Sequence, residues 1–162
     1  MAIFQYILER HAGALGWPEP DKARAVAQSI SFEMHSGFLA VRDELPQNIR
    51  ARRKRDLAEL SEACVNQIER IDQIWSECRR EYGEQGPWLF GALSLADIMF
   101  APVALRFVTY QIPIRDAAAQ FQRAICDLPT VQHWIAAANE EPEAIAFIDD
   151  HVPAAESPLT LG

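Results

Sequence analysis

The chain has 162 residues, of which 49% are hydrophobic and 23% are charged, a composition typical of one soluble globular domain. Its formal net charge of −8 argues against nucleic acid or an anionic membrane as the main partner, because both present negative phosphates. No apolar run reaches the roughly 18 residues of a membrane-spanning helix, and the N-terminus lacks the features of a secretory signal peptide. The three cysteines form no Cys-x-x-Cys pair, which favours reduced thiols and a cytoplasmic location.

The first half of the chain predicts one short helix and two long ones, because apolar residues recur at spacings of three and four. Residues 2–10 predict the short helix, and residues 11–20, which hold two glycines and two prolines, predict a linker. A long helix is expected from Asp21 to about Leu45, with Pro46 ending it. Its expected inward positions are Val26, Ile30, Met34, Phe38 or Val41, and Leu45.

A second long helix is expected from about Ala51 to Tyr82, with Gly83 ending it. One continuous apolar stripe favours this helix, formed by Leu57, Leu60, Cys64, Ile68, Ile71, Trp75, Cys78 and Tyr82. At its start, the run from Arg50 to Arg55 has five positive charges in six residues. We expect this run to be solvated surface rather than a nucleic-acid patch or a localisation signal, because the chain as a whole is acidic.

The next helix has the clearest start signal in the chain. Ser94 is a natural N-cap, and Asp97 three residues later completes a capping box, with Asp in place of Glu or Gln. Both residues are therefore expected to have a structural role as the cap of the helix. From Leu95 to Phe107 the sequence is apolar on nearly every side, which predicts a central helix buried in a globular core. Pro102 lies inside this helix and should bend it.

Shorter helices are expected in the last third of the chain. After a break at residues 110–113, residues 114–127 and 129–139 each predict a helix, and residues 142–150 predict one or two further turns. Residues 151–162 hold two prolines and predict an extended or frayed tail. The four histidines are scattered without metal-ligand spacing, so no metal site is expected. The chain as a whole is predicted to be all-α.

Four stretches resemble the cytosolic glutathione transferases, especially bacterial members of that family, and they occur in the right order. They are Ser31–Phe38 (SFEMHSGF), Pro46–Arg50 (PQNIR), Ser94–Asp97 (SLAD, after a hydrophobic residue) and Leu128–Trp134 (LPTVQHW). The resemblance covers nearly the whole chain. It implies that residues 21–150 form an orthogonal helical bundle of the glutathione S-transferase C-terminal domain type.

The resemblance also implies a second domain. Residues 2–10 match the last helix of the family's thioredoxin-like N-terminal domain, so we interpret residues 1–10 as a remnant of that domain and residues 11–20 as the linker. In the family, that domain binds glutathione and carries the residue that stabilises its thiolate. We therefore expect no catalytic residue and no bound cofactor in this chain alone, and glutathione as the co-substrate of the complete enzyme. A cloned fragment, an internal start codon or a natural truncation would each explain such a chain.

The first long helix holds the main candidates for substrate binding. Ser31, His35, Phe38 and Arg42 fall at spacings of four, three and four, so they are expected to share one unusually polar face. In the family, the matching helix lines the pocket for the electrophilic substrate. The resemblance thus implies that His35, Phe38 and Arg42 contact a hydrophobic electrophile. For His35 the alternative is a half-buried histidine at a domain or dimer interface.

The end of the central helix supplies the other candidates. Arg106, Phe107 and Tyr110 are interpreted as the far wall of the same pocket, on the strength of the resemblance. The alternative is that the aromatic rings belong to the core, as aromatic residues at such positions more often do. Tyr110 is expected to be more exposed than Phe107, because it directly precedes the Gln-Ile-Pro break.

Two functions remain open at this point. One is the helical substrate-binding domain of a glutathione-conjugating detoxification enzyme, inactive by itself. The other is a non-catalytic protein-interaction module of the same fold. The polar face around His35 favours the first. A homodimer or a larger oligomer is expected, because truncation exposes apolar surface. The residues expected to be exposed in this way are Ile3, Phe4, Ile7, Leu8 and Trp17.

Overall fold

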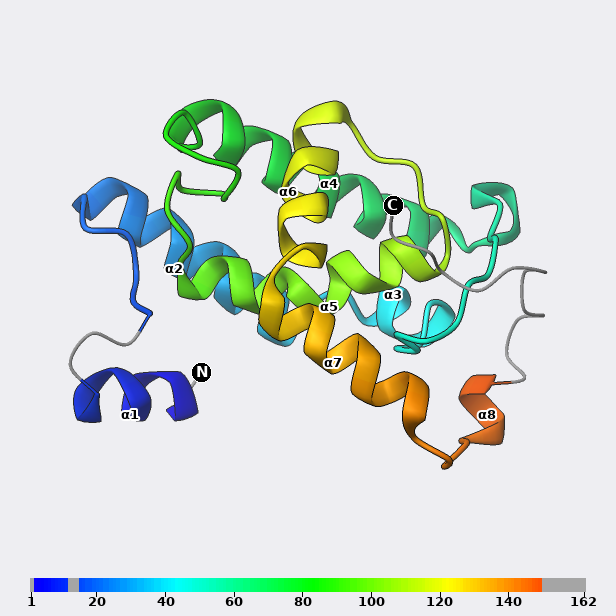
Figure 1. Ribbon diagram of the computed structural model, residues 1–162. Coiled ribbons are helices and arrows are strands. Elements are labelled where there is room, and N and C mark those ends of the chain that lie inside the picture. Colours follow the sequence, from blue (N-terminus) through cyan, green and yellow to red (C-terminus); the bar gives the residue numbers. More distant parts are fainter. Residues whose placement is uncertain (1, 12–14, 150–162) are drawn as a thin grey trace.

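The computed structural model describes residues 2–11 and 15–149. In this part of the chain, helices are joined by loops and no strand occurs, so the predicted all-α class is confirmed (Figure 1). The tail predicted for residues 151–162 lies outside the described residues. The elements are α1 (Ala2–Arg10), α2 (Asp21–Ser36), α3 (Leu39–Glu44), a 3₁₀ turn η1 (Leu57–Glu59), α4 (Glu62–Tyr82), α5 (Leu95–Thr109), α6 (Asp116–Cys126), α7 (Pro129–Glu140) and α8 (Ala146–Asp149).

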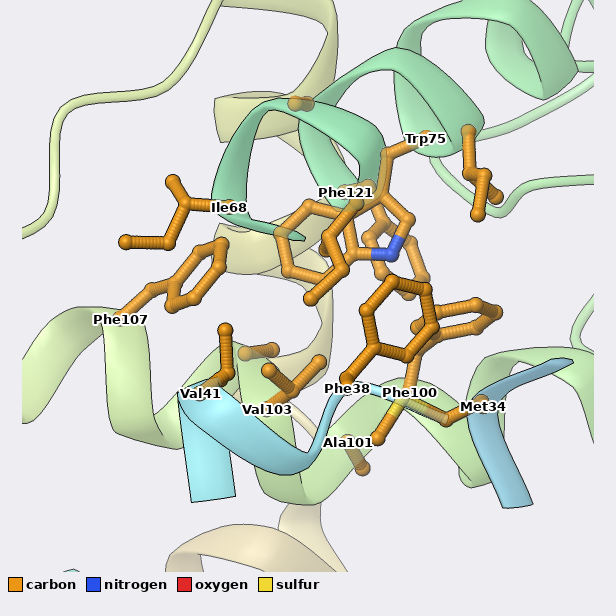
Figure 2. Packing of buried hydrophobic residues seen from close by; sticks show 14 of the residues in the cluster. Met34, Phe38, Val41, Ile68, Trp75, Phe100, Ala101, Val103, Phe107 and Phe121 are labelled. Atoms are coloured by element: carbon orange, nitrogen blue, oxygen red, sulfur yellow. The ribbon is translucent and has the colours of Figure 1, made fainter. Parts of the chain in front are cut away.

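The core is built around α5 and the indole of Trp75. Helix α5 packs against both α2 and α6, while α4 packs against α3 and α6. The ring centroids of Phe100, Phe107 and Phe121 lie 6.0, 5.5 and 5.1 Å from that of Trp75, within the range of favourable aromatic pairs. Figure 2 shows these rings gathered between the helices, together with Phe38 from the link between α2 and α3. The predicted central helix is therefore confirmed.

The prediction of a single long helix over residues 21–45 is wrong in one respect, because the segment is broken into α2 and α3. The amide of Gly37 donates to the carbonyl oxygen of Glu33 at 2.8 Å and closes α2. Phe38 then adopts a left-handed conformation, with φ at 58°, which turns the chain before α3. A Cβ at position 37 would lie 2.7 Å from the Glu33 oxygen, so glycine fits this turn. The predicted inward positions after Val26 are nevertheless buried: Ile30, Met34, Phe38, Val41 and Leu45.

The second long helix begins at Glu62, later than the predicted start at Ala51. The hydroxyl of Ser61 accepts a hydrogen bond from the amide of Cys64 at 3.1 Å and caps the first turn. The helix ends at its predicted position, with Gly83 as the C-cap. The apolar stripe is confirmed within the helix, where the buried residues include Cys64, Ile68, Ile71, Trp75 and Cys78.

Residues 51–56 form no helix because they pair with the end of α5. The backbone amides of Arg53 and Arg55 donate to the carbonyl oxygens of Thr109 and Tyr110 at 2.7 and 3.1 Å. The last carbonyls of a helix have no partner within the helix, so these two bonds satisfy acceptors that would otherwise be buried without one. This tertiary pairing overrides the helical propensity of the segment.

The start of α5 confirms the predicted capping box. Asp97 is buried, and its carboxylate accepts hydrogen bonds from the amide and the hydroxyl of Ser94, both at 2.7 Å. It also accepts one from the amide of Leu89 at 2.9 Å, a bond that no sequence motif predicts. Burial raises the pKa of Asp97 above its usual range, while these hydrogen bonds act in the opposite direction. In the loop before the cap, Gly91 has φ at +82°, a conformation that favours glycine.

Helices α6 and α7 lie close to the ranges predicted for them, which were residues 114–127 and 129–139. Helix α8 supplies one turn inside the range 142–150, where one or two were predicted. A second, smaller apolar cluster forms where α7 packs near the ends of α5 and α6. Its buried members are Ile49, Leu105, Cys126, Val131 and Ile135.

Candidate functional site

The four residues predicted to share one polar face do not do so, because the helix breaks among them. Ser31 is buried, and its hydroxyl donates to the carbonyl oxygen of Ala27 at 2.7 Å. Phe38 points into the core with the other rings of Figure 2, whereas His35 is exposed at the end of α2. Arg42 is half-buried on α3. Of these four side chains, only His35 and Arg42 reach the surface.

Arg42 and Arg106 hold the two ends of α3. Arg42 donates to the carbonyl oxygens of Met34 and Gly37 at 2.6 and 3.3 Å, which ties α3 to the end of α2. Arg106 donates to the carbonyl oxygen of Leu45 at 2.9 Å. Burial, together with the nearby charge of Arg42, lowers the pKa of Arg106 to about 10. Both predicted site residues thus have a positioning role in the observed fold.

Phe107 and Tyr110 both lie in the core. The expectation that Tyr110 is more exposed than Phe107 is wrong: the ring of Tyr110 is fully buried, and its hydroxyl donates to the carbonyl oxygen of Pro46 at 3.0 Å. Burial also raises the pKa of Tyr110. Phe107 packs against Trp75. Tyr110 is buried because residues 46–50 cover the end of α5 and offer its phenol an acceptor.

A further residue of this junction was not among the sequence candidates. The hydroxyl of Thr109 donates to the carbonyl oxygen of Asn48 at 2.8 Å. Together with the bonds from Arg106 and Tyr110, it gives three side chains at the end of α5 that hold residues 45–48. The signal in the sequence that could have predicted this positioning role is the cluster of polar residues at the end of an otherwise apolar helix.

The basic run is solvated surface only in part, because Lys54 is exposed whereas Arg53 is buried. Arg53 is only 2% exposed, and its guanidinium donates to the carbonyl oxygen of Ile148 at 3.0 Å. Arg50 donates to the carbonyl oxygens of Glu141 and Glu143, both at 2.7 Å. Carbonyl oxygens are good acceptors for guanidinium groups, so these cations hold the segment after α7 in place.

The exposed side chains around the break between α2 and α3 form what we call the α2–α3 surface, defined by Phe32, His35 and Leu39. Phe32 is 54% exposed and Leu39 is 69% exposed, which is high for large apolar residues. The imidazole of His35 has no hydrogen-bond or ion-pair partner within residues 2–11 and 15–149. A shallow hollow of about 480 Å³ adjoins this surface and is lined by Leu39, Ala40, Arg42 and Asp43.

Helix α1 stands apart from the bundle (Figure 1). It exposes three large side chains, Ile3, Tyr6 and Ile7. The predicted exposure is therefore confirmed for Ile3 and Ile7, while Phe4 and Leu8 are half-buried. For Trp17 it is wrong, because the indole packs against the main core. Within the described part of the chain, Ile3 and Ile7 are thus apolar side chains of α1 that remain exposed.

Neither a membrane-spanning helix nor a metal cluster is found in the part of the chain that the structure describes. No helix there is long and apolar enough to cross a bilayer. No three His, Cys, Asp or Glu side chains gather there as metal ligands would. All three cysteines are free and buried. Burial raises the pKa of Cys64 and Cys126 to about 11 and that of Cys78 to about 12, so these thiols are unreactive near neutral pH.

The comparisons with known proteins agree with this architecture. Residues 40–137, more than half of the chain, match the family described as glutathione S-transferase, C-terminal domain. A crystal structure of a glutathione transferase homologue from Burkholderia GL BGR1, determined with bound glutathione, has a similar fold, with a TM-score of 0.59 and 21% sequence identity. The match covers 86% of this chain and 66% of that one, so this chain spans a little under two thirds of that protein. No curated protein matches the chain. The chain belongs to the glutathione S-transferase family, through the C-terminal domain of that family.

Proposed function

We propose that the chain is the helical, electrophile-binding domain of a glutathione-dependent detoxification transferase. The observation that carries the proposal is the α2–α3 surface, where two exposed apolar side chains accompany an imidazole that has no partner among the residues that the structure describes. Exposed apolar surface of this kind is stabilised by an apolar ligand or a covering domain. A hydrophobic electrophile held between this surface and a glutathione-binding domain accounts for both features.

The predicted substrate residues divide into three groups under this proposal. His35 and Arg42 retain accessible side-chain surface, and Arg42 lines the hollow beside Leu39, so we assign substrate contact to these residues. Arg106 positions the segment after α3 through its bond to Leu45. Phe38, Phe107 and Tyr110 are buried and support the surface from within the core.

Conjugation requires chemistry that we assign to a thioredoxin-like domain. The sulfur of glutathione, as its thiolate, attacks the electrophilic carbon of an aryl halide, and the halide ion leaves with the electron pair of the broken bond. A positioned donor must stabilise the thiolate before the attack. The apolar residues that α1 exposes support a second domain packed on that helix. We propose that glutathione binds there as co-substrate, and that the 162-residue chain alone is inactive.

The cellular setting follows from the same proposal. Three free, buried thiols are consistent with a reducing cytoplasm. The exposed apolar residues of α1 also support association of the chain into a homodimer or a larger oligomer. The competing function is a non-catalytic interaction module, in which the same apolar surfaces bind another protein.

The test compares the 162-residue chain with a chain extended at its N-terminus by the upstream in-frame coding sequence. Both are applied to immobilised glutathione and assayed for conjugation of glutathione to chlorodinitrobenzene. The proposal predicts that the extended chain is retained and turns over, while the shorter chain stays at the background rate. Turnover by the shorter chain well above background would overturn the assignment of thiol activation to a second domain. An extended chain that neither binds glutathione nor conjugates it would favour the interaction module.

A further inference from the structure

A second cleft lies away from the α2–α3 surface. It has a volume of about 720 Å³, within the range of pockets that hold small organic ligands. Its walls come from the end of α4, the loop that follows α4, and the junction of α6 with α7, which Figure 1 shows in yellow and orange. None of its lining residues belongs to α2, α3 or α5. Its apolar lining consists of Pro87, Trp88, Ala124, Leu128 and Pro129.

The loop that carries Trp88 is held by Arg79 of α4. The guanidinium of Arg79 donates to the carbonyl oxygens of Gly83 at 3.0 Å and Trp88 at 3.1 Å, and also to that of Gly86. The same group donates to the side chain of Gln120 on α6 at 3.1 Å. One cation thus fixes the indole wall relative to the α6 wall. A cleft with fixed walls loses little conformational freedom when a ligand binds, which favours affinity.

The charge in the cleft is positive although the chain is acidic. Arg79 and Arg123 are cationic, and Asp127 is the single acidic residue in the lining. Arg79 already donates to four oxygen atoms, as described above. The guanidinium of Arg123 is exposed and has no hydrogen-bond or ion-pair partner within residues 2–11 and 15–149, Asp127 included. Arg123 is therefore available to an anionic ligand.

We propose that this cleft binds a small aromatic carboxylate. The aromatic ring lies against Trp88 and Leu128, where apolar surface is partly open to solvent. The carboxylate accepts charge-assisted hydrogen bonds from Arg123, whose planar fork matches two carboxylate oxygens. Asp127 at the rim disfavours ligands with more than one negative charge. The site is separate from the electrophile surface, so it does not depend on the proposed transferase function.

The experiment titrates naphthoate and its neutral analogue naphthamide into the 162-residue chain, and follows backbone amide signals by nuclear magnetic resonance. The proposal predicts shifts of the amide signals from Gly86 and Trp88 and from residues 123–128. It predicts that naphthoate binds about tenfold more tightly than naphthamide, which corresponds to one charge-assisted hydrogen-bonded pair. Arg123→Gln should abolish this preference for the carboxylate and leave naphthamide binding unchanged. Trp88→Leu should weaken both ligands while the preference remains.

Matched controls keep the result interpretable. Arg80→Gln removes the same charge from an exposed position of α4 outside the cleft, and should leave both affinities unchanged. His35→Ala alters the α2–α3 surface and should also leave naphthoate binding unchanged. Equal affinity for the two ligands, an equal loss in Arg80→Gln and Arg123→Gln, or signal shifts confined to the α2–α3 surface would each overturn the proposal. A failure of this kind would leave the transferase proposal untouched.

Discussion

The carboxylate of Asp97 accepts a hydrogen bond from the backbone amide of Leu89 at 2.9 Å, and this bond joins the loop before α5 to the first turn of the helix. The same carboxylate accepts from the amide and hydroxyl of Ser94. The capping box therefore does more than begin a helix. It also fixes the loop at Leu89. The neighbouring residue in the chain, Trp88, lines the second cleft.

Removal of this carboxylate should destabilise the fold more than removal of the capping hydroxyl. Asp97→Ala leaves the buried amides of Leu89 and Ser94 without acceptors, so we expect a loss of about 2–4 kcal/mol in the free energy of unfolding. Ser94→Ala removes only the hydroxyl and should cost about 1 kcal/mol. Urea denaturation of both variants measures the difference. Equal losses in the two variants, or no loss in Ser94→Ala, would show that the capping assignment is incorrect.

The phenol of Tyr110 should contribute to stability through its bond to Pro46. Tyr110→Phe removes the hydroxyl and leaves a buried carbonyl oxygen unpaired, so we expect a loss of about 1–2 kcal/mol. Tyr6→Phe is the matched control, because Tyr6 is exposed on α1, and it should leave the melting temperature unchanged. If the two substitutions have the same effect in thermal unfolding, the hydroxyl of Tyr110 does not hold residues 46–48.

The buried thiols should be protected in the folded chain. At about pH 8, a thiol reagent such as dithionitrobenzoate should label none of Cys64, Cys78 and Cys126 rapidly, and should label all three in denaturant. The sign of the pH effect follows from linkage. The unfolded thiols lose protons near 9.0, below the raised pKa of the folded thiols, so stability falls as the pH rises from about 9 towards 11 and above. Rapid labelling of the native chain would contradict the burial of these side chains.

Helix α1 should drive association of the chain. We expect the purified chain to form a dimer or larger species, and the double substitution Ile3→Ser and Ile7→Ser to shift it towards monomer. Trp134→Ser alters another exposed apolar residue, on α7, and serves as the control that should leave the molar mass unchanged. Light scattering after size-exclusion chromatography gives the molar mass. A wild-type chain that stays strictly monomeric at high concentration is the contrary result.

Sequence patterns predicted the core well and its interruptions poorly. The stripe from Cys64 to Cys78 and the capping box at Ser94 are local signals, and both are confirmed. The break after Ser36 was missed because apolar spacing continues through Phe38, while the turn depends on one glycine and one left-handed residue. Nothing in the local spacing of residues 51–56 indicates that carbonyl oxygens at the end of α5 bind their amides.

The candidate site was predictable only in part for the same reason. Family resemblance drew attention to six residues, but exposure decides which of them reach a ligand, and exposure depends on packing between distant segments. Tyr110 precedes a loop, and in sequence it resembles a surface residue. It is buried because residues 46–50 fold over the end of α5 and supply an acceptor for its hydroxyl. Phe32 and Leu39, by contrast, lie outside the predicted inward positions of the helix and are exposed.

The measurement that tests the central proposal most directly is the kinetics of the N-terminally extended chain with chlorodinitrobenzene. Leu39→Ser changes the α2–α3 surface, and Trp134→Ser makes a comparable change at an exposed apolar residue elsewhere. We predict that Leu39→Ser raises the KM for chlorodinitrobenzene about tenfold, in keeping with the loss of one buried apolar side chain from a binding surface, and leaves the KM for glutathione unchanged. Trp134→Ser should change neither constant. An unchanged KM for chlorodinitrobenzene in Leu39→Ser would contradict the assignment of this surface to the electrophile.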